Sequence, residues 1–140
     1  MLRAAAEAAG GNCLVVAVSV LTSLDAAGIA KAWGRDGLDL EREVLRLARS
    51  AVDVGIRGLV CSGHEAAQIR AELGNDLKLI VPGIRFADGG AQDQARVVTP
   101  AGAARAGADY VVLGRAVTAS SDPVGAMLRV NAELQSALNE

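Results

Sequence analysis

Aromatic side chains are almost absent from this sequence, which has one Trp, one Tyr and one Phe among 140 residues. The formal net charge is only -2, and the basic residues form no cluster. Because proteins that bind nucleic acids need a basic surface, often with aromatic side chains that stack on bases, this composition excludes that class. The longest apolar runs have the length of a strand and fall well short of the ~20 residues that span a bilayer, so no membrane segment is expected.

The chain has only two cysteines, Cys13 and Cys61, which lie in or beside apolar runs and far apart in the sequence. This placement predicts two buried, reduced thiols rather than a disulfide or a metal-binding pair. No spacing of Cys, His, Asp and Glu is typical of a metal site, so neither a metal nor a cofactor is expected. The first residues, MLRAAAEAAGG, contain no apolar signal-peptide core, and we expect a cytoplasmic protein.

What the chain has in abundance is small and aliphatic residues, since apolar residues make up 51% of it. A core must therefore be built from Ala, Val, Leu and Ile. This suits parallel strands that are buried on both faces and covered by Ala-rich helices. The length fits a single domain over residues 1–140.

The apolar pattern predicts a helix, then four strands that alternate with helices. The predicted strands are Cys13–Ser23, Gly58–Cys61, Leu77–Val81 and Tyr110–Leu113. The predicted helices are residues 1–9, Asp25–Trp33, Asp39–Val54, a helix from a capping box at Ser62–Glu65 to Leu73, one from Thr99-Pro100 to Gly107, and one from Asp122-Pro123 to Leu138.

Four such units in one chain amount to about 35 residues each, near the length of one unit of a (β/α)8 barrel. The pattern therefore predicts an α/β fold with a parallel sheet. A small open parallel sheet is the alternative architecture, because alternating strands and helices permit it as well.

In parallel α/β folds the functional site lies at the carboxyl ends of the strands. The third and fourth predicted strands end in the most informative residues. Arg85 follows the third strand and opens a long polar loop that contains Gln94, and Gly114-Arg115 follows the fourth. A glycine lets backbone N–H groups approach an anion, and arginine can bind a phosphate bidentately. These ends predict a phosphate site, with solvated surface arginines as the alternative.

The other polar residues at strand ends carry weaker signals. His64, the sole histidine, follows the second strand at the start of a helix, and we interpret it as an ordinary first-turn residue. Ser23 and Ser62 lie in no nucleophile-elbow pattern. These residues alone predict no catalytic group.

Three stretches together resemble a known family: VLTSLD, GLVCSGHEA, and the long string LKLIVPGIRFADGGAQDQARVVTPAGAARAGADYVVLGRAVTASSDPVGAM. They are similar to the C-terminal half of bacterial orotidine 5'-phosphate decarboxylase. The resemblance implies a dimeric (β/α)8 barrel that converts orotidine monophosphate (OMP) to uridine monophosphate (UMP) and CO2 in pyrimidine biosynthesis, without a metal or organic cofactor. By this resemblance the chain starts at the helix after the barrel's fourth strand and is half a barrel, about four βα units preceded by one helix.

The resemblance also implies a substrate-binding set: Thr22, Ser23, Pro82, Arg85, Gln94, Gly114 and Arg115. Arg85 and Arg115 would contact the phosphate, and Gly114 would supply backbone. Gln94 would bridge the phosphate and the pyrimidine, and Thr22 with the serine after it would lie near the pyrimidine. The long loop would be the lid that closes over the phosphate.

One part of the family's pattern is missing from these 140 residues. The family's catalytic signature is Asp-x-Lys-x-x-Asp, whose lysine protonates the carbon that loses CO2. The chain has only two lysines, Lys31 and Lys78. Asp76-Leu-Lys78 begins like the signature but continues without a second Asp, at the start of a predicted strand and away from the site. We therefore assign no catalytic residue and expect the chain alone to be inactive.

Two other readings stay open. The chain could be a non-catalytic module, a half-barrel that binds a nucleotide monophosphate and forms homo-oligomers through its open sheet edges. It could also be related to the decarboxylase-like sugar-phosphate synthases, although the DQ.R..TP spacing argues against this reading.

Overall fold

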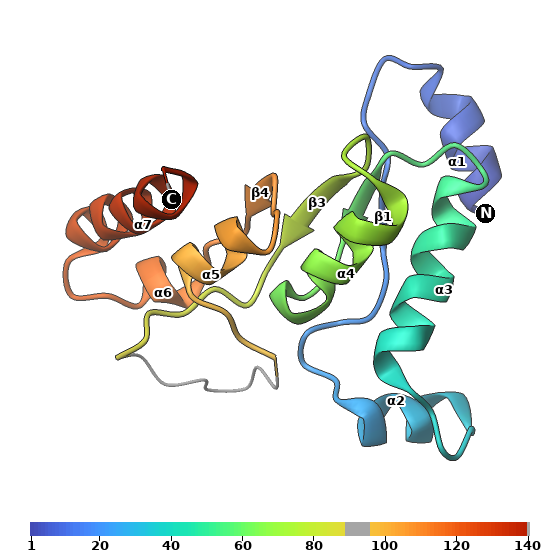
Figure 1. Cartoon of the computed structure of the whole chain (residues 1–140), viewed down its shortest axis with the longest axis horizontal. Helices are drawn as coiled ribbons and strands as arrows, with labels where there is room; N and C mark the ends of the chain where they lie inside the picture. The colour runs from blue at the N-terminus through green and yellow to red at the C-terminus, as the bar shows by residue number, and fades with distance from the viewer. Residues whose placement is uncertain (89–95, 140) are drawn as a thin grey trace.

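The computed structural model describes residues 1–88 and 96–139 and contains one parallel sheet flanked by helices (Figure 1). The strands, in sheet order, are β1 (Val16–Val18), β2 (Gly58–Val60), β3 (Lys78–Val81) and β4 (Tyr110–Val111). All neighbours pair in parallel, and Ala17, Leu59 and Leu79 lie side by side across the first three strands. The carboxyl ends of all four strands therefore meet at one edge of the sheet.

The helices are α1 (Leu2–Ala9), α2 (Ala26–Trp33), α3 (Leu40–Val52), α4 (Gly63–Leu73), α5 (Pro100–Arg105), α6 (Arg115–Thr118) and α7 (Pro123–Leu138). The two predicted caps are present, a capping box of Ser62 with Glu65 at the start of α4 and Thr99 at the start of α5. Asp25, Asp39, Thr99 and Asp122 accept backbone N–H groups at the starts of α2, α3, α5 and α7. These side chains satisfy donors that a helix start leaves without a partner. Within the described residues, no helix is both long and apolar enough to cross a membrane.

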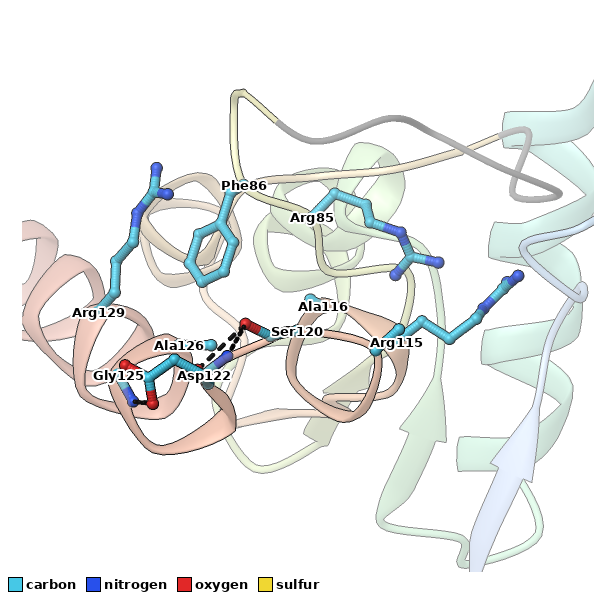
Figure 2. A pocket seen from close by; sticks show the side chains of 10 residues that line it. Arg85, Phe86, Arg115, Ala116, Ser120, Asp122, Gly125, Ala126 and Arg129 are labelled. Carbon is cyan, nitrogen blue, oxygen red and sulfur yellow. Dashed lines mark hydrogen bonds between the residues drawn. The ribbon is translucent and has the colours of Figure 1, made fainter.

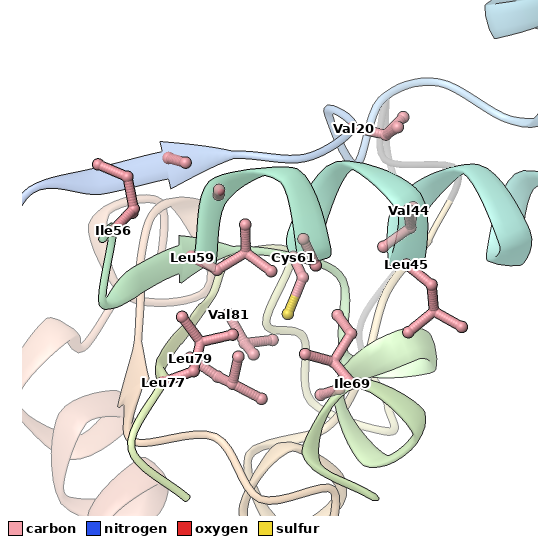
Figure 3. Packing of buried hydrophobic residues seen from close by; sticks show 14 of the residues in the cluster. Val20, Val44, Leu45, Ile56, Leu59, Cys61, Ile69, Leu77, Leu79 and Val81 are labelled. Carbon is pink, nitrogen blue, oxygen red and sulfur yellow. The ribbon is translucent and has the colours of Figure 1, made fainter. Parts of the chain in front are cut away.

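The core lies between the sheet and the helices. Leu59, Leu79 and Val81 are fully buried on the face that packs against Val44 of α3 and Ile69 of α4 (Figure 3). Helix α3 packs on α4, α4 on α5, and α5 on α7, so the helices form one continuous layer. The composition predicted parallel strands with Ala-rich covering helices, which the structure contains, but it also predicted burial on both faces of the sheet, which is wrong for the described residues.

The opposite face of the sheet is open among the described residues. Val16 and Val18 on β1 and Val112 after β4 are all exposed, although each is apolar. They alternate with buried neighbours such as Ala17, as expected for a strand with one covered face. Strands β1 and β4 form the two edges of the sheet. The molecule thus presents an apolar sheet face and two strand edges.

The first strand is much shorter than predicted. Only Val16–Val18 pairs with β2, because β2 offers three residues as partners. Cys13 lies before the paired region and is exposed, so the prediction of a buried thiol is wrong there. Cys61 is buried as predicted. The one-turn helix α6 was not predicted.

A polar cluster at the start of β3 joins it to β4. The carboxylate of Asp109 accepts hydrogen bonds from Arg70 (2.6 Å), Lys78 (2.8 Å) and the backbone N–H of Leu79 (2.9 Å). Burial alone would raise the pKa of Asp109, but these hydrogen bonds outweigh it and lower that pKa. The hydrogen bond to Asp109 raises the pKa of Lys78. Lys78 is therefore committed to a structural ion pair at the end of the sheet opposite the candidate site.

The two cysteines should differ sharply in reactivity. Burial, with the nearby charge of Glu65, raises the pKa of Cys61 to about 12, so almost no thiolate forms at pH 8. We expect a thiol reagent such as Ellman's reagent to modify one cysteine per folded chain at pH 8 and two in denaturant. A Cys13→Ser variant is the control and should not react while folded. Equal rates for both thiols in the native protein would contradict the packing described for Cys61.

Candidate functional site

A pocket of about 170 Å³ lies at the carboxyl edge of the sheet. It is lined by Thr22, Pro82, Gly83, Arg85, Val112, Gly114 and Arg115. Five of the residues predicted from sequence thus meet in one place, although they come from the ends of three different strands. Parallel pairing brings them together, because it places the ends of β1, β3 and β4 at the same edge.

Arg85 is the buried cation of this pocket, with 8% of its surface exposed. Its backbone N–H donates to Val98 (3.0 Å), and its Nη1 donates to the carbonyl oxygen of Ile84 (2.7 Å). Its Nε has no hydrogen-bond partner among the residues that the structure describes. A buried guanidinium is costly unless acceptors satisfy it, which makes Arg85 a candidate anion-binding group.

Arg115 and Gly114 complete the cationic side of the pocket. Arg115 is exposed and begins α6, directly after Gly114. Figure 2 shows the guanidinium groups of Arg115 and Arg85 extending to the same side, away from Phe86 and Arg129. Gly114 has a negative φ, and a Cβ there would meet nothing within 4 Å. The space beside Gly114 is therefore open to a ligand.

Of the remaining predicted residues, only some line the pocket. Thr22 is buried and lines the pocket, whereas Ser23 is exposed and is not among the lining residues. Gln94 lies outside the described residues. His64 is the second residue of α4, as predicted, and its Nε2 donates to the carbonyl oxygen of Val97 (3.0 Å). That contact gives His64 a structural partner.

Residues 96–98, here called the cross-strand segment, touch the ends of three successive strands. The backbone N–H of Arg96 donates to Thr22 after β1 (3.3 Å). Val97 accepts from His64 after β2. Val98 forms a β-bridge with Ile84, which follows β3. The carbonyl of Val98 accepts from the N–H of Arg85, and the N–H of Val98 donates to the carbonyl of Gly83. The cross-strand segment therefore joins the two sides of the pocket.

The anchor of the cross-strand segment is a buried ion pair that sequence reasoning missed. Arg96 pairs with Glu65, and its Nη2 also donates to the carbonyl oxygens of Val20 (3.1 Å) and Leu21 (3.0 Å). From sequence, Glu65 was assigned only to the capping box of α4, so its pairing with Arg96 was not predicted. The available signal was the position of Arg96 directly before the apolar pair Val97-Val98.

A second, larger pocket of about 410 Å³ shares Arg85 and Arg115 with the first. Its other charged residues already have partners. Arg129 stacks on the Phe86 ring (4.1 Å to its centroid) and pairs with Asp88 (3.0 Å). Asp122 caps α7 by accepting from a backbone N–H. The charged residues that line the smaller pocket, Arg85 and Arg115, are both cations, whereas the larger pocket also contains the carboxylate of Asp122, so the smaller pocket is the candidate anion site.

These features define a class: half of a parallel α/β barrel with a pocket lined by two arginines at the carboxyl ends of its strands. The family model of the orotidine 5'-phosphate decarboxylase / HUMPS family matches residues 1–130, and the chain belongs to this family.

Curated relatives support the assignment. The chain is 43% identical over 137 residues to orotidine 5'-phosphate decarboxylase of Chromobacterium violaceum, and 50% identical over 134 and 135 residues to those of Anaeromyxobacter dehalogenans and Thermobifida fusca. Each match covers 96% of this chain but only 55–58% of the relative. The chain thus spans a little over half the length of the relatives that it matches.

Solved structures give the same picture of the fold. Orotidine 5'-phosphate decarboxylase from Lactobacillus acidophilus superposes with a TM-score of 0.76 at 27% identity, covering 96% of this chain and 58% of that one. The enzyme from Pyrococcus horikoshii superposes with a TM-score of 0.64 at 21% identity, which bears on the fold alone. The predicted α/β fold, corresponding to about half of a (β/α)8 barrel, is confirmed.

Close packing under the pocket yields a stability prediction. A Cβ on Gly63 would lie 2.6 Å from Cγ1 of Val98, so Gly63→Ala must displace the cross-strand segment. We expect a loss of about 1–3 kcal/mol, typical of overpacking, measured by urea unfolding. Gly114→Ala is the matched control, because its Cβ meets nothing, and it should change stability by less than about 0.5 kcal/mol. Similar losses in both variants would contradict the packing.

Proposed function

We propose that this chain forms the phosphate-binding half of an orotidine 5'-phosphate decarboxylase site and binds a nucleotide monophosphate. The observation that carries the proposal is the pocket in which Arg85 and Arg115 meet at the ends of β3 and β4. Two guanidinium groups, one of them largely buried, favour a dianionic phosphate over a neutral ligand. The curated relatives carry the name of an enzyme whose substrate bears such a phosphate.

Each residue of the site has a role in this proposal. Arg85 and Arg115 bind the phosphate oxygens, and the open side of Gly114 lets the backbone approach them. Thr22, across the pocket, contacts the pyrimidine end together with Pro82. By resemblance, Ser23 assists Thr22 and Gln94 bridges phosphate and pyrimidine.

The phosphate lies far from the carbon that reacts, so its binding energy serves to hold and orient the nucleotide. Contacts to a remote group can offset the cost of ordering the reacting groups in the transition state. Such contacts do not themselves break the bond to CO2. This chain's pocket therefore supplies binding and orientation, and the chemistry must come from other groups.

The reaction needs a proton donor at the carbon that loses CO2. The electron pair left by CO2 must take up a proton, which the family's signature lysine supplies. Neither lysine of this chain can take that role: Lys78 starts β3 and is paired with Asp109, and Lys31 lies on α2 and is exposed. We infer that decarboxylation requires residues beyond these 140.

A non-catalytic binding module is the second candidate, and the exposed sheet face favours it. Val18 and Val112 project apolar side chains from a face that no described helix covers. Sheet edges and apolar faces of this kind recruit other chains. We propose that the chain forms homo-oligomers through them.

Titration with UMP tests the binding role. Because only the phosphate half of the pocket is present, we expect a dissociation constant of about 1 mM, or roughly -4 kcal/mol. Arg115→Ala should remove most of the NMR shift changes, whereas Thr22→Ala, the matched control in the same pocket, should barely alter the affinity. Salt should weaken binding, because exposed charge dominates it. Equal losses from both substitutions, or tight binding that ignores salt, would refute a phosphate-dominated site.

Complementation separates the two candidate functions. The 140-residue chain alone should show no decarboxylation of OMP above background, because it lacks the lysine–aspartate array. Co-expression with the part of a relative that carries Asp-x-Lys-x-x-Asp should restore turnover if the chain is an enzyme half. The same mixture with Arg115→Ala is the control and should be far less active. Turnover by the chain alone would contradict the proposal, and UMP binding without restored turnover would favour the binding module.

A further inference from the structure

We propose that Arg96 is a positioning residue for the phosphate pocket: paired with Glu65, it fixes the cross-strand segment, which in turn holds Arg85. This role rests on the proposed function, because it bears on ligand binding only if the pocket takes a phosphate. Arg96 itself is not among the residues that line the pocket. It acts through backbone contacts at both sides of the site.

The pair is built as a rigid anchor. Arg96 is 6% exposed and Glu65 is 2% exposed, and a buried charge persists only when it is paired and hydrogen-bonded. One carboxylate oxygen of Glu65 accepts from Arg96, and the other accepts from the backbone N–H of Ser62 (3.1 Å). The start of α4 therefore fixes Glu65, and Glu65 fixes the guanidinium.

Beyond β1, hydrogen bonds from Arg96 replace those that a neighbouring strand would supply. The apolar run continues past Val18, but the regular strand stops there. Three consecutive carbonyls, those of Val20, Leu21 and Thr22, accept hydrogen bonds from the side chain and backbone of Arg96. Buried carbonyls need such partners, and the fork of one guanidinium supplies two of them while still binding a carboxylate. Lysine, with a single ammonium, cannot match this geometry.

The other end of the same segment holds Arg85. Val98 accepts from the backbone N–H of Arg85 (3.0 Å) and donates to the carbonyl oxygen of Gly83 (3.2 Å). Only one residue separates Val98 from Arg96. A shift of Arg96 is therefore transmitted through two peptide units to Val98, and through the hydrogen bond of Val98 to Arg85. Loss of the anchor should loosen Arg85 without removing any group that touches the ligand.

The test uses a double variant, Arg96→Met with Glu65→Gln. It leaves no uncompensated buried charge, and Gln keeps an acceptor for Ser62, so the fold should survive while the carbonyls after β1 lose their donor. The control is Glu43→Gln with Arg46→Met, which removes a more exposed ion pair (2.7 Å) on α3, where neither residue lines the pocket. Arg96→Lys is a third variant that retains the charge.

Two NMR readouts decide the question. In the double variant we expect hydrogen exchange at the Arg85 amide to quicken about tenfold or more, and affinity for inorganic phosphate to fall about fivefold. The control pair should change neither, and Arg96→Lys should give intermediate values. Unchanged Arg85 exchange and unchanged affinity in a folded double variant would overturn the role.

The outcomes also separate this role from the proposed function. If the wild-type chain shows no phosphate binding, the proposed function fails, and exchange at the Arg85 amide still decides whether Arg96 positions it. If the double variant does not fold, Arg96→Lys decides instead. Faster Arg85 exchange in that variant supports the role, and wild-type exchange contradicts it.

Discussion

The parallel pairing of four strands in order is the constraint on which the rest of this structure depends. It brings the ends of β1, β3 and β4 to one edge, so that Thr22, Arg85 and Arg115 share a pocket despite their separation along the chain. Helices α3, α4, α5 and α7 pack in one layer on one face of this sheet, and Val16 and Val18 are exposed on the other face. Binding site and open apolar face are two consequences of one sheet.

Around that edge, the cost of burying charge organises the local structure. Arg85 and Arg96 are both largely buried, but they meet this cost differently. The Nη atoms of Arg96 donate to Glu65 and to carbonyls after β1, which gives Arg96 a structural role. The Nη1 of Arg85 donates to the carbonyl of Ile84, and the Nε of each arginine has no partner among the described residues. The difference is that Arg96 pairs with a buried carboxylate whereas Arg85 lines the pocket, so we propose Arg85 as the residue that binds the ligand.

Much of the fold follows from local sequence signals. Caps such as Ser62 and Thr99, together with the Val-rich runs, predicted the order and type of nearly every element, because they act through neighbouring residues. The length of β1 could not be predicted, since it depends on how many partners β2 offers. Exposure of Cys13 follows from that pairing too. The Arg96–Glu65 pair escaped prediction because it joins residues 31 positions apart, which only the folded chain brings together.

The site itself was predicted in part by chemistry and in part by resemblance. Arginine and glycine at strand ends indicated an anion site, whereas the roles of Thr22 and Pro82 came from the family pattern alone. The central claim is that the phosphate lies between Arg85 and Arg115. A crystal structure of the chain with UMP tests it most directly. We expect phosphate density in hydrogen-bond contact with both guanidinium groups and beside Gly114. Phosphate bound instead at Arg129 in the larger pocket would contradict it.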